Sequence, residues 1–552
     1  MVKELRDRTV GGLLDEMAER FGEREAVVYP ERQLRWNYQE FHRQCNQAAK
    51  GLMRLGIRAG DHLAVWASNQ PEWLVMQFAT GKMGAVLVTV NTNYRTQELE
   101  YLLRQSDTET LILMDSFKGV SYVDMLVEIC PELMQAEPGQ LRAERLPRLR
   151  NVIFLGDERK PGMFNWSEVM RMGEHVPDTA LWERQRSLRC EEVINMQYTS
   201  GTTGFPKGVM LTHHNIVNNA HQIAACMQLT EHDRMCIPVP FFHCFGCVLG
   251  TLACVSVGAT MVPVVEFNPL TVLKTVEKER CTALHGVPTM FIAELDHPDF
   301  SRFNLSSLRT GIMAGSNCPM EVMKRVIHDM GATEITIAYG QTESSPVISQ
   351  TRTKDSIERR VSTVGQKLPH VEVKVIDPDT GEEVAPGVQG ELCTRGYHVM
   401  KGYYRMPEET ALAIDDDGWL HTGDLARMDE EGYLRITGRL KDMIIRGGEN
   451  IYPREIEEFL HTHPKVRDIQ VVGIPDEKYG EEVMAFIRVE EGESLDLDEM
   501  RAFCDGMIAP YKIPSRMEIV ADYPLTASGK VQKFRLREMA VKALGRSDLV
   551  ER

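Results

Sequence analysis

The stretch Tyr198-Thr-Ser-Gly-Thr-Thr-Gly-Phe-Pro-Lys-Gly208 decides how this 552-residue sequence is interpreted. Its three glycines let the backbone bend and bring N–H groups close to a ligand, while the hydroxyls and Lys207 add donors and a positive charge. This composition is typical of a cradle for a polyphosphate. The stretch is not a P-loop, because Gly208 follows Lys207 and the spacing G-x-x-x-x-G-K-[ST] is absent. A flexible surface turn is the plainer alternative.

The residues before this loop favour phosphate capture over a surface turn. Val193-Ile-Asn-Met-Gln-Tyr198 predicts a short buried strand that runs directly into the loop, the usual arrangement at a phosphate site. Strand-like runs alternate with helical patterns on both sides of it, which predicts doubly wound, largely parallel sheets. The other predicted strands of this part are His62–Ala67, Ala85–Val90, Thr110–Met114, Arg234–Val239, Thr260–Val265 and Glu334–Ala338.

The pattern changes after about residue 350. Short alternating strands lie between Gly, Pro and Asp turns, which predicts an antiparallel, barrel-like subdomain. A small mixed segment follows from roughly Lys441. The elements predicted here are strands at Val371–Ile376, Gly390–Thr394, Ile469–Gly473 and Val483–Val489, and helices at Glu455–Leu460 and Leu497–Met507.

The predicted fold is therefore α/β with two domains. The large N-terminal domain covers 1–439, with two α/β subdomains to about 350 and the barrel-like subdomain at about 351–439. A small α+β C-terminal domain covers 440–552. The chain is long enough for a large core, which its 43% hydrophobic residues can fill.

Composition narrows the classes of partner. The net charge of −17 argues against nucleic-acid binding, which depends on basic patches. The N-terminal residues are acidic and have no apolar signal core, and the twelve cysteines show no disulfide framework. A reduced, cytoplasmic setting fits these features best. The assembly state stays open, with a homo-oligomer as one option.

Two local patterns have a more ordinary explanation than the one they first suggest. Cys244 and Cys247 form a C-x-x-C beside His243, but no second pair stands near, so a zinc or redox role is the weaker interpretation. The uncharged stretch Phe245–Val265 is long enough to span a membrane, but glycines interrupt it. We expect a buried helix followed by a buried strand, and no transmembrane segment.

Four further motifs follow the loop in a fixed order. They are Tyr339-Gly-Gln-Thr-Glu-Ser344, Trp419-Leu-His-Thr-Gly-Asp424, Gly438-Arg-Leu-Lys-Asp442 and Pro524-Leu-Thr-Ala-Ser-Gly-Lys530. With the loop, this set resembles the adenylate-forming (AMP-binding) superfamily over nearly the whole chain. Within it, Pro240–Gly246, Lys441–Pro453 and His461–Val466 look like the medium-chain acyl-CoA synthetases of the mitochondrial type and their bacterial relatives.

The resemblance implies a ligase that uses ATP, Mg²⁺ and coenzyme A. A carboxylate attacks the α-phosphate of ATP to give an acyl-adenylate, and a thiol then displaces AMP. By match to the family's motifs, the β- and γ-phosphates would be held by Thr199, Ser200, Gly201, Thr202, Thr203, Gly204 and Lys207. Such donors spread the charge of the leaving pyrophosphate.

The resemblance also assigns roles around the nucleotide. Glu343 matches the magnesium-side carboxylate, Thr342 the contact to the α-phosphate and Tyr339 the adenine stack. Asp424 would accept hydrogen bonds from the ribose, supported by Arg439. A turn acid and a surface ion pair are the ordinary explanations for these last two.

The C-terminal domain would carry the catalytic lysine of the first step. Lys530 would stabilise charge that builds on the α-phosphate while the carboxylate attacks. Lys441 matches the family's hinge, about which a mobile C-terminal domain swings after adenylation. Gly447, Gly448 and Glu449 would then lie near the pantetheine arm of coenzyme A.

The acyl site is expected around His243. The neutral imidazole would orient the carboxylate or assist the thiol, although a buried structural histidine is an alternative. The resemblance places the acyl pocket at Phe245, Leu249, Gly315, Gly340, Pro346 and Val347, with Gly315 also beside the nucleotide. Apart from the glycines these residues are apolar, which favours a hydrophobic carboxylic acid over an amino acid. Cys247 stands near the place where long-chain enzymes of the family often carry a gating tryptophan, which argues against very long chains.

Other functions are open at this stage. The chain is predicted to activate a medium-chain fatty acid or similar acid, and an aryl or alicyclic acid is an alternative. An enzyme that loads a carrier protein differs only in the acceptor, but no carrier domain is evident. Nothing in the sequence favours an oxygenase of the luciferase type. A binding protein without catalysis would not need Lys530, Glu343 and Asp424 together.

Overall fold

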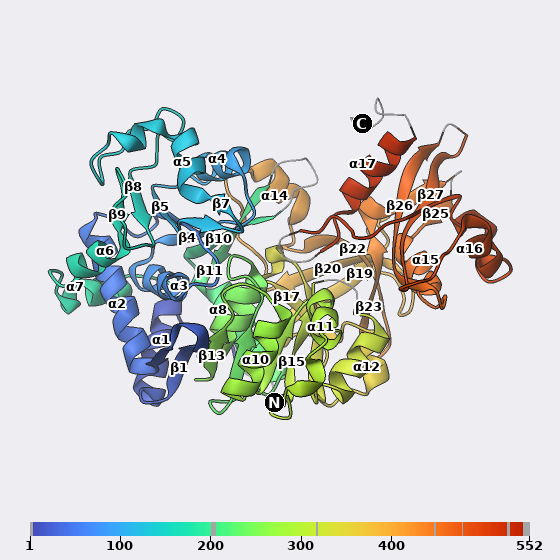
Figure 1. The fold of residues 1–552 in the computed structure, drawn as a ribbon, viewed down its shortest axis with the longest axis horizontal. Coiled ribbons are helices and arrows are strands. Elements are labelled where there is room, and N and C mark those ends of the chain that lie inside the picture. Colours follow the sequence, from blue (N-terminus) through green and yellow to red (C-terminus); the bar gives the residue numbers. More distant parts are fainter. Residues whose placement is uncertain are drawn as a thin grey trace. The chain divides into compact units, whose positions relative to one another are not determined.

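A computed structural model describes residues 4–199, 206–315, 318–446, 449–476, 478–526 and 530–544. The chain forms two compact units. The first comprises Met1–Glu372 and Thr394–Leu420, and the second Val373–Cys393 and His421–Arg552. The second unit is orange to red in Figure 1, apart from its earliest strands.

An eight-stranded sheet in the first unit carries the strand that leads into the glycine-rich loop. Six consecutive strands, from β10 to the edge strand β9, are parallel, as predicted, and the other edge is completed by β11 and β21, each antiparallel to its neighbour. In spatial order the strands are β21 (Gly402–Tyr403), β11 (Lys207–Thr212), β10 (Val193–Thr199), β4 (Val86–Thr89), β3 (His62–Trp66), β5 (Thr110–Leu113), β8 (Asn151–Phe154) and β9 (Phe164–Asn165).

A nine-stranded sheet forms the other half of this unit. Its central strands are parallel and both ends are antiparallel, which confirms the doubly wound prediction. The order is β18 (Gln366–Lys367), β17 (Val347–Gln350), β16 (Glu334–Gly340), β15 (Thr310–Ala314), β14 (Ala283–Gly286), β12 (Arg234–Ile237), β13 (Thr260–Pro263), β1 (Glu25–Tyr29) and β2 (Leu34–Asn37).

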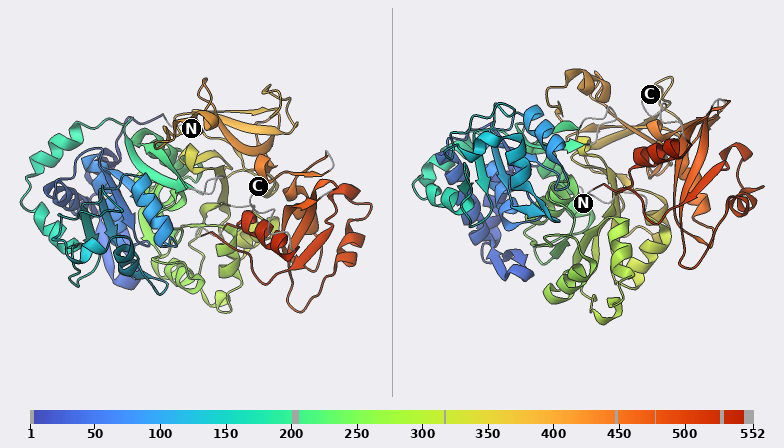
Figure 2. Two further views of the ribbon diagram at one scale, coloured as in Figure 1. Left: turned by 90° about the horizontal axis from the view of Figure 1, so that it is seen from above. Right: turned by 45° about the horizontal axis from the view of Figure 1, so that its top comes forward.

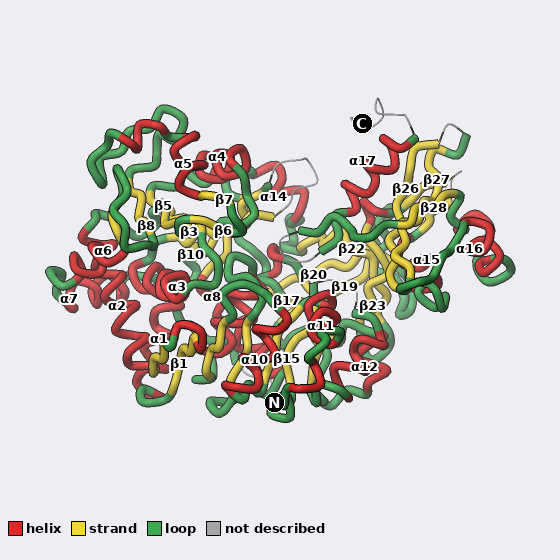
Figure 3. Tube along the Cα trace, viewed as in Figure 1, coloured by secondary structure: helices red, strands yellow, loops and turns green. Residues whose placement is uncertain are grey.

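Helices pack on both sheets (Figure 3). Buried side chains of α10, α11 and α12 form one core with the nine-stranded sheet, and the three helices lie beside its strands in Figure 1. The remaining short strands are β6 (Ser116–Phe117) and β7 (Val120–Ser121). The α-helices of the unit are α1 (Val10–Phe21), α2 (Tyr38–Arg54), α3 (Pro71–Met83), α4 (Thr96–Gln105), α5 (Tyr122–Ile129), α6 (Trp166–Gly173), α7 (Asp178–Arg186), α8 (His213–Cys226), α9 (Ala253–Val255), α10 (Pro269–Glu279), α11 (Pro288–Leu295), α12 (Met320–His328), α13 (Ile357–Ser362) and α14 (Pro407–Ala413).

Helix α8 joins the two sheets. It contacts β10 and β11 of one sheet and β17 of the other, and nearly all of its residues are buried. Its Asn219 donates to the carbonyl of Val347 on β17 (2.8 Å) and accepts from the Val347 N–H (3.1 Å). This bidentate contact satisfies a buried backbone pair and fixes β17 against α8.

The uncharged stretch that begins at Phe245 is a buried helix followed by a strand, as predicted. It opens with a π-helix, η3 (Phe245–Leu252), continues into α9 and reaches β13. Among the described residues no helix has the length and apolar character needed to cross a bilayer. The other short helices of the unit are η1 (Pro30–Arg32), η2 (Pro131–Met134), η4 (Phe300–Arg302) and η5 (Thr342–Ser344).

The second unit contains two sheets (Figure 2). The region predicted to be barrel-like supplies a four-stranded sheet, β19 (Val371–Ile376), β20 (Gly390–Gly396), β22 (Leu420–Met428) and β23 (Leu434–Arg439), whose end residues fall partly in the first unit. The second sheet contains β25 (Glu449–Ile451), β24 (Ile444–Arg446), β27 (Gly480–Val489), β26 (Val466–Asp476) and β28 (Arg516–Ile519).

Two small cores cover opposite faces of this second sheet. Val471 belongs to a core with α15 and α16, whereas the next residue, Val472, packs with α17, as the alternation of a strand requires. The helices of the unit are η6 (Leu440–Asp442), α15 (Pro453–Leu460), α16 (Leu497–Cys504), η7 (Pro510–Lys512) and α17 (Lys533–Ala543).

Candidate functional site

Strands β10 and β11 form the two arms of a hairpin that holds the glycine-rich loop. Thr199 at the end of β10 pairs with Lys207 at the start of β11. The hydroxyl of Tyr101 donates to the carbonyl of Pro206 (3.1 Å), which anchors the return arm. The predicted phosphate contacts Ser200, Gly201, Thr202, Thr203 and Gly204 lie outside the described residues.

Lys207 is the charged residue at the base of this hairpin. Its ammonium forms an ion pair with Glu409 of α14 and lies 5.1 Å from the ring centroid of Tyr403. The lysine side chain is only 13% exposed, so the carboxylate and the ring compensate a largely desolvated cation.

Glu343 and Thr342 lie beside the same strand, since η5 contacts β11. The Glu343 carboxylate accepts a hydrogen bond from the Tyr403 hydroxyl (2.9 Å), and its backbone carbonyl accepts from the Met400 N–H (2.8 Å). Thr342 is 7% exposed. The first unit thus brings together the predicted phosphate lysine and the predicted magnesium-side carboxylate.

Tyr403 and Glu409 are site residues that the sequence motifs did not indicate. Burial, and then the Glu343 carboxylate, raise the pKa of Tyr403 well above its ordinary value, so the phenol stays a neutral donor. The local sequence offers only a weak signal for them, a Gly-Tyr pair shortly before a proline-initiated helix. Their role depends on strand pairing, which the local pattern does not show.

His243 precedes the π-helix of the predicted acyl pocket. Its Nδ1 accepts from the Phe245 N–H (3.1 Å), so the ring carries its proton on Nε2 when neutral. A Cβ on Gly246 would lie 2.2 Å from the carbonyl oxygen of Pro240, so this turn requires glycine. The turn fixes the direction of the His243 side chain relative to the backbone.

A second histidine, His285 on β14, holds the predicted pocket residues in place. Its Nε2 contacts the Leu249 carbonyl (3.0 Å), its Nδ1 accepts from the Ile312 N–H (3.1 Å), and its ring centroid lies 5.5 Å from that of Phe245. Burial lowers the pKa of His285 to about 4, which keeps the ring neutral. Phe245 and Leu249 are themselves buried.

The hairpin of β16 and β17 carries the other predicted pocket residues. Pro346 and Val347 are buried, and Tyr339, on β16, is half-buried. A Cβ on Gly340 would lie 1.8 Å from the Pro346 carbonyl oxygen, so a close backbone approach requires this glycine. Gly315, just after β15, is exposed and has a φ of 95°, which favours glycine.

In the second unit, Asp424 and Arg439 are paired across β22 and β23. Arg439 Nε donates to Asp424 Oδ1 (2.7 Å), and Asp424 is 3% exposed. Glu391, which the sequence did not indicate, supports this turn. Its carboxylate accepts from the Gly423 N–H (3.0 Å) and contacts His421 Nδ1 (2.9 Å).

Lys530 lies in a small turn before α17. The Thr526 N–H donates to the Lys530 carbonyl (2.7 Å), and the Lys530 N–H donates to the Thr526 hydroxyl (3.0 Å). The predicted hinge residue Lys441 is exposed within η6. Gly447 and Gly448 lie outside the described residues, and Glu449 is described only through the backbone of β25.

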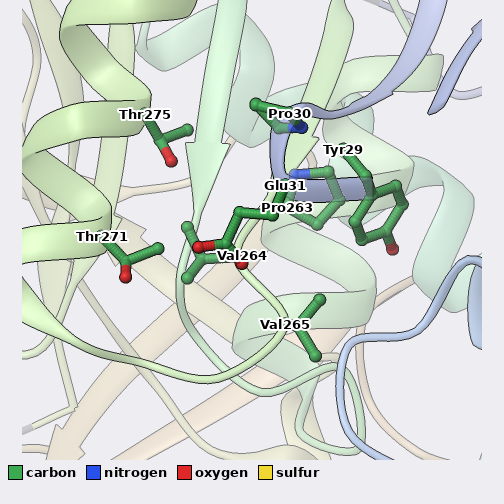
Figure 4. A pocket seen from close by; sticks show the side chains of 8 residues that line it. All are labelled: Tyr29, Pro30, Glu31, Pro263, Val264, Val265, Thr271 and Thr275. Carbon is green, nitrogen blue, oxygen red and sulfur yellow. The ribbon is translucent and has the colours of Figure 1, made fainter. Parts of the chain in front are cut away.

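A small hollow in the first unit is lined by none of the predicted site residues (Figure 4). Its volume of about 10 Å³ gives room for about one water molecule, too little for an acyl chain. It is lined by Tyr29, Pro30, Glu31, Pro263, Val264, Val265, Thr271 and Thr275.

Comparison with known proteins identifies the family of the chain. Residues 14–404 match the AMP-binding enzyme family, and residues 455–530 match the AMP-binding enzyme C-terminal domain. YngI of Bacillus subtilis (strain 168), provisionally named an acyl-CoA synthetase, is 63% identical over 98% of both chains. The mitochondrial medium-chain acyl-CoA ligase ACSF2 of Danio rerio is 46% identical over 98% of this chain and 90% of its own.

A solved structure extends the likeness to the whole fold. The crystal structure of ATP-bound MatB from Rhodopseudomonas palustris has a TM-score of 0.83 and 27% sequence identity, over 99% of this chain and 100% of that chain. The chain belongs to the AMP-binding enzyme family, the adenylate-forming enzymes. Within this family it belongs to the acyl-CoA synthetase branch, the AMP-forming acid–CoA ligases.

Proposed function

We propose that this acyl-CoA synthetase activates a medium-chain fatty acid, or a similar hydrophobic acid, with ATP and transfers the acyl group to coenzyme A. The observation that carries the nucleotide assignment is that Lys207 and Glu343 both contact Tyr403 beside the β10–β11 hairpin. A cation and a carboxylate placed together there suit a polyphosphate and its counterion.

In the first half-reaction an oxygen of the substrate carboxylate forms a bond to the α-phosphorus of ATP. The bond from that phosphorus to the bridging oxygen breaks, and pyrophosphate leaves with the electron pair. Lys207 and the loop donors hold the leaving group, and Lys530 stabilises the charge on the α-phosphate. In the second half, the thiol of coenzyme A loses its proton to solvent and its sulfur forms a bond to the acyl carbon. The bond from that carbon to the phosphate oxygen breaks, and AMP leaves with the electron pair.

The described residues fit a magnesium ion on the phosphate side. Magnesium prefers oxygen ligands, and Glu343 offers a carboxylate, while the preceding residue, the buried Thr342, offers a hydroxyl. Bound with ATP, the ion would neutralise phosphate charge. Asp424, oriented by Arg439, would accept from the ribose hydroxyls, and Tyr339 would stack on the adenine.

The hydrogen bond to His243 Nδ1 suits a contact of the ring with the substrate carboxylate. With Nδ1 occupied by the Phe245 N–H, the free-base ring presents Nε2–H as a donor. We propose that this N–H orients the acyl carboxylate and that the C-terminal domain, residues 440–552, swings about Lys441 to bring Gly447, Gly448 and Glu449 to the thiol. This motion would remove Lys530 once the adenylate is formed.

The substrate class rests on the buried apolar residues Phe245, Leu249, Pro346 and Val347. They offer no charged partner for an amino group, and a buried unpaired charge is costly. The relatives named as medium-chain acyl-CoA ligases favour the same class. An aryl or alicyclic acid, or a carrier-protein acceptor, is the alternative.

A single assay separates these outcomes. AMP release should depend on coenzyme A and peak with acids of medium chain length in a series from two to eighteen carbons. Benzoate and cyclohexanecarboxylate belong in the same series, since a preference for either would favour the aryl or alicyclic alternative. Turnover with a carrier protein but not with coenzyme A would contradict the proposed acceptor.

A further inference from the structure

The segment 400–413 lies beside the β10–β11 hairpin, which carries Lys207. Strand β21 pairs with β11, so Tyr403 lies opposite Val209, two residues from Lys207. The Lys401 N–H donates to the Met210 carbonyl (2.9 Å), and the Tyr404 N–H donates to the Gly208 carbonyl (2.8 Å). The pairing therefore places the Tyr403 ring directly beside the strand that carries Lys207.

One side chain of this segment, Tyr403, contacts both Glu343 and Lys207. The Tyr403 hydroxyl donates to Glu343 Oε1 (2.9 Å), and the Lys207 ammonium lies 5.1 Å from the centroid of the same ring. A charge-assisted hydrogen bond fixes the carboxylate, and a cation–π contact attracts the ammonium. Tyr403 is only 9% exposed, so water competes little with either contact.

The backbone of Tyr403 is held by α14. The Tyr403 N–H donates to the hydroxyl of Thr410 (2.9 Å), which in turn donates to the Met406 carbonyl (2.8 Å). Glu409, the residue before Thr410, is the ion-pair partner of Lys207. The same helix therefore fixes the tyrosine and supplies the counterion of the lysine.

Such support has a physical purpose in catalysis. Glutamate and lysine are long, flexible side chains that lose conformational freedom when they bind a ligand in one geometry. A neighbour that holds them in advance lowers this cost and tightens the geometry of the bound nucleotide.

We propose that Tyr403 is a positioning residue for the nucleotide half-reaction. Its hydroxyl orients the Glu343 carboxylate and its ring face orients the Lys207 ammonium, and it acts through these two side chains. The inference rests on the proposed function, because it assigns a purpose to contacts at the proposed ATP site.

The test compares Tyr403→Phe with a matched variant, Tyr404→Phe. Tyr404 is the next residue, and its hydroxyl also donates to a carboxylate, Asp107 Oδ2 (2.8 Å). Tyr403→Phe should lower kcat/KM for ATP in ATP–pyrophosphate exchange by about 10-fold to 100-fold, as for the loss of a hydrogen bond to a charged group. It should leave transfer from a supplied acyl-adenylate to coenzyme A unchanged. Tyr404→Phe should match the parent in both assays.

A binding measurement separates positioning from a merely structural role. Electron paramagnetic resonance of Mn²⁺, used in place of Mg²⁺, should show about 10-fold weaker binding with ATP to Tyr403→Phe than to the parent. In a Glu343→Gln background the substitution Tyr403→Phe should have little further effect, because the two act through one contact. Tyr403→Leu, which also removes the ring, should weaken binding more than Tyr403→Phe.

Parent-like exchange kinetics and Mn²⁺ affinity in Tyr403→Phe would overturn the proposal, as would a lower melting temperature with unchanged Mn²⁺ affinity. If the parent enzyme releases no AMP with any acid, the proposed function fails. The comparison of Mn²⁺–ATP affinities still decides the role of Tyr403 in that case.

Discussion

The two lysines assigned to the reaction are held in different ways. The first unit fixes the Lys207 side chain itself, through Glu409 and the face of Tyr403. The second unit fixes the backbone at Lys530, through a turn closed by Thr526. The first arrangement suits a charge that stays beside the phosphates, and the second suits a charge carried on a domain that is proposed to move.

The largest effect is expected when Lys530, the catalytic lysine proposed for the second unit, is removed. Lys530→Ala should lower the adenylation rate by about 10²–10³, the usual loss for one contact to transition-state charge. Transfer from a supplied acyl-adenylate to coenzyme A should persist. Lys533→Ala, three residues along and paired with Glu457 (2.6 Å), is the control and should keep both half-reactions. Equal losses in the two half-reactions of Lys530→Ala would refute its assignment to the first step.

A smaller effect is expected for Lys207, whose side chain is held by Glu409 and Tyr403. Lys207→Met should raise KM for ATP by about 10-fold to 100-fold, because one charged partner of the phosphates is lost. Because Lys207 is proposed to hold the phosphates equally before and during the reaction, most of the effect should fall on KM and not on kcat. Steady-state kinetics at saturating acid measures this division. A variant with normal KM and a collapsed kcat would show that Lys207 and Lys530 act alike.

The units should also differ in their sensitivity to acid. Burial lowers the pKa of His213 and His398 to about 3 and that of His285 to about 4, from 6.5, and all three belong to the first unit. They are neutral when folded and become protonated when unfolded, so the free energy of unfolding should fall as the pH drops from 6.5 toward 4.

This acid sensitivity has a quantitative check. Each histidine should contribute up to about 1.4 kcal/mol per pH unit to the slope of the free energy of unfolding within that window. Denaturant unfolding of His398→Asn between pH 7 and 5 should show a shallower slope than the parent. An identical slope would contradict the assignment of buried neutral histidine.

The smallest expected effect concerns the choice of acid, which we assign to the first unit alone. Val347→Ala removes two buried methyl groups from the proposed pocket and should shift kcat/KM toward longer acids by about 3-fold to 10-fold. Val326→Ala, on α12 and equally buried, should cost stability without changing the preference. A shift in both variants, or in neither, would remove Val347 from the pocket.

Local sequence patterns predicted most of the fold. The predicted strands at His62–Ala67, Thr110–Met114 and Val193–Tyr198 are confirmed to within a residue or two at their ends. Strand β26 is longer than predicted, Val466–Asp476 instead of Ile469–Gly473. Its ends carry exposed or half-exposed polar residues such as Arg467 and Asp476, which hide the alternation.

The site was predictable only where its residues lie in motifs. Lys207, Glu343, Asp424 and Lys530 were found in this way, and their catalytic roles remain proposals. Glu409 lies 202 residues from Lys207 in the sequence, and no local pattern reports a contact that depends on the pairing of β21 with β11. The role of Gly340 is similarly tertiary, since it depends on where the Pro346 carbonyl lies.

Strand β21 has a consequence for the behaviour of the protein in solution. It is the outermost strand of the eight-stranded sheet and covers β11, whose Val209 and Leu211 are buried. A long open edge invites pairing with another chain, whereas a two-residue edge strand followed by a proline offers such a partner little to extend. The segment that is proposed to orient Lys207 and Glu343 thus also closes the edge of the sheet, and a variant that loosens it should aggregate as well as lose activity.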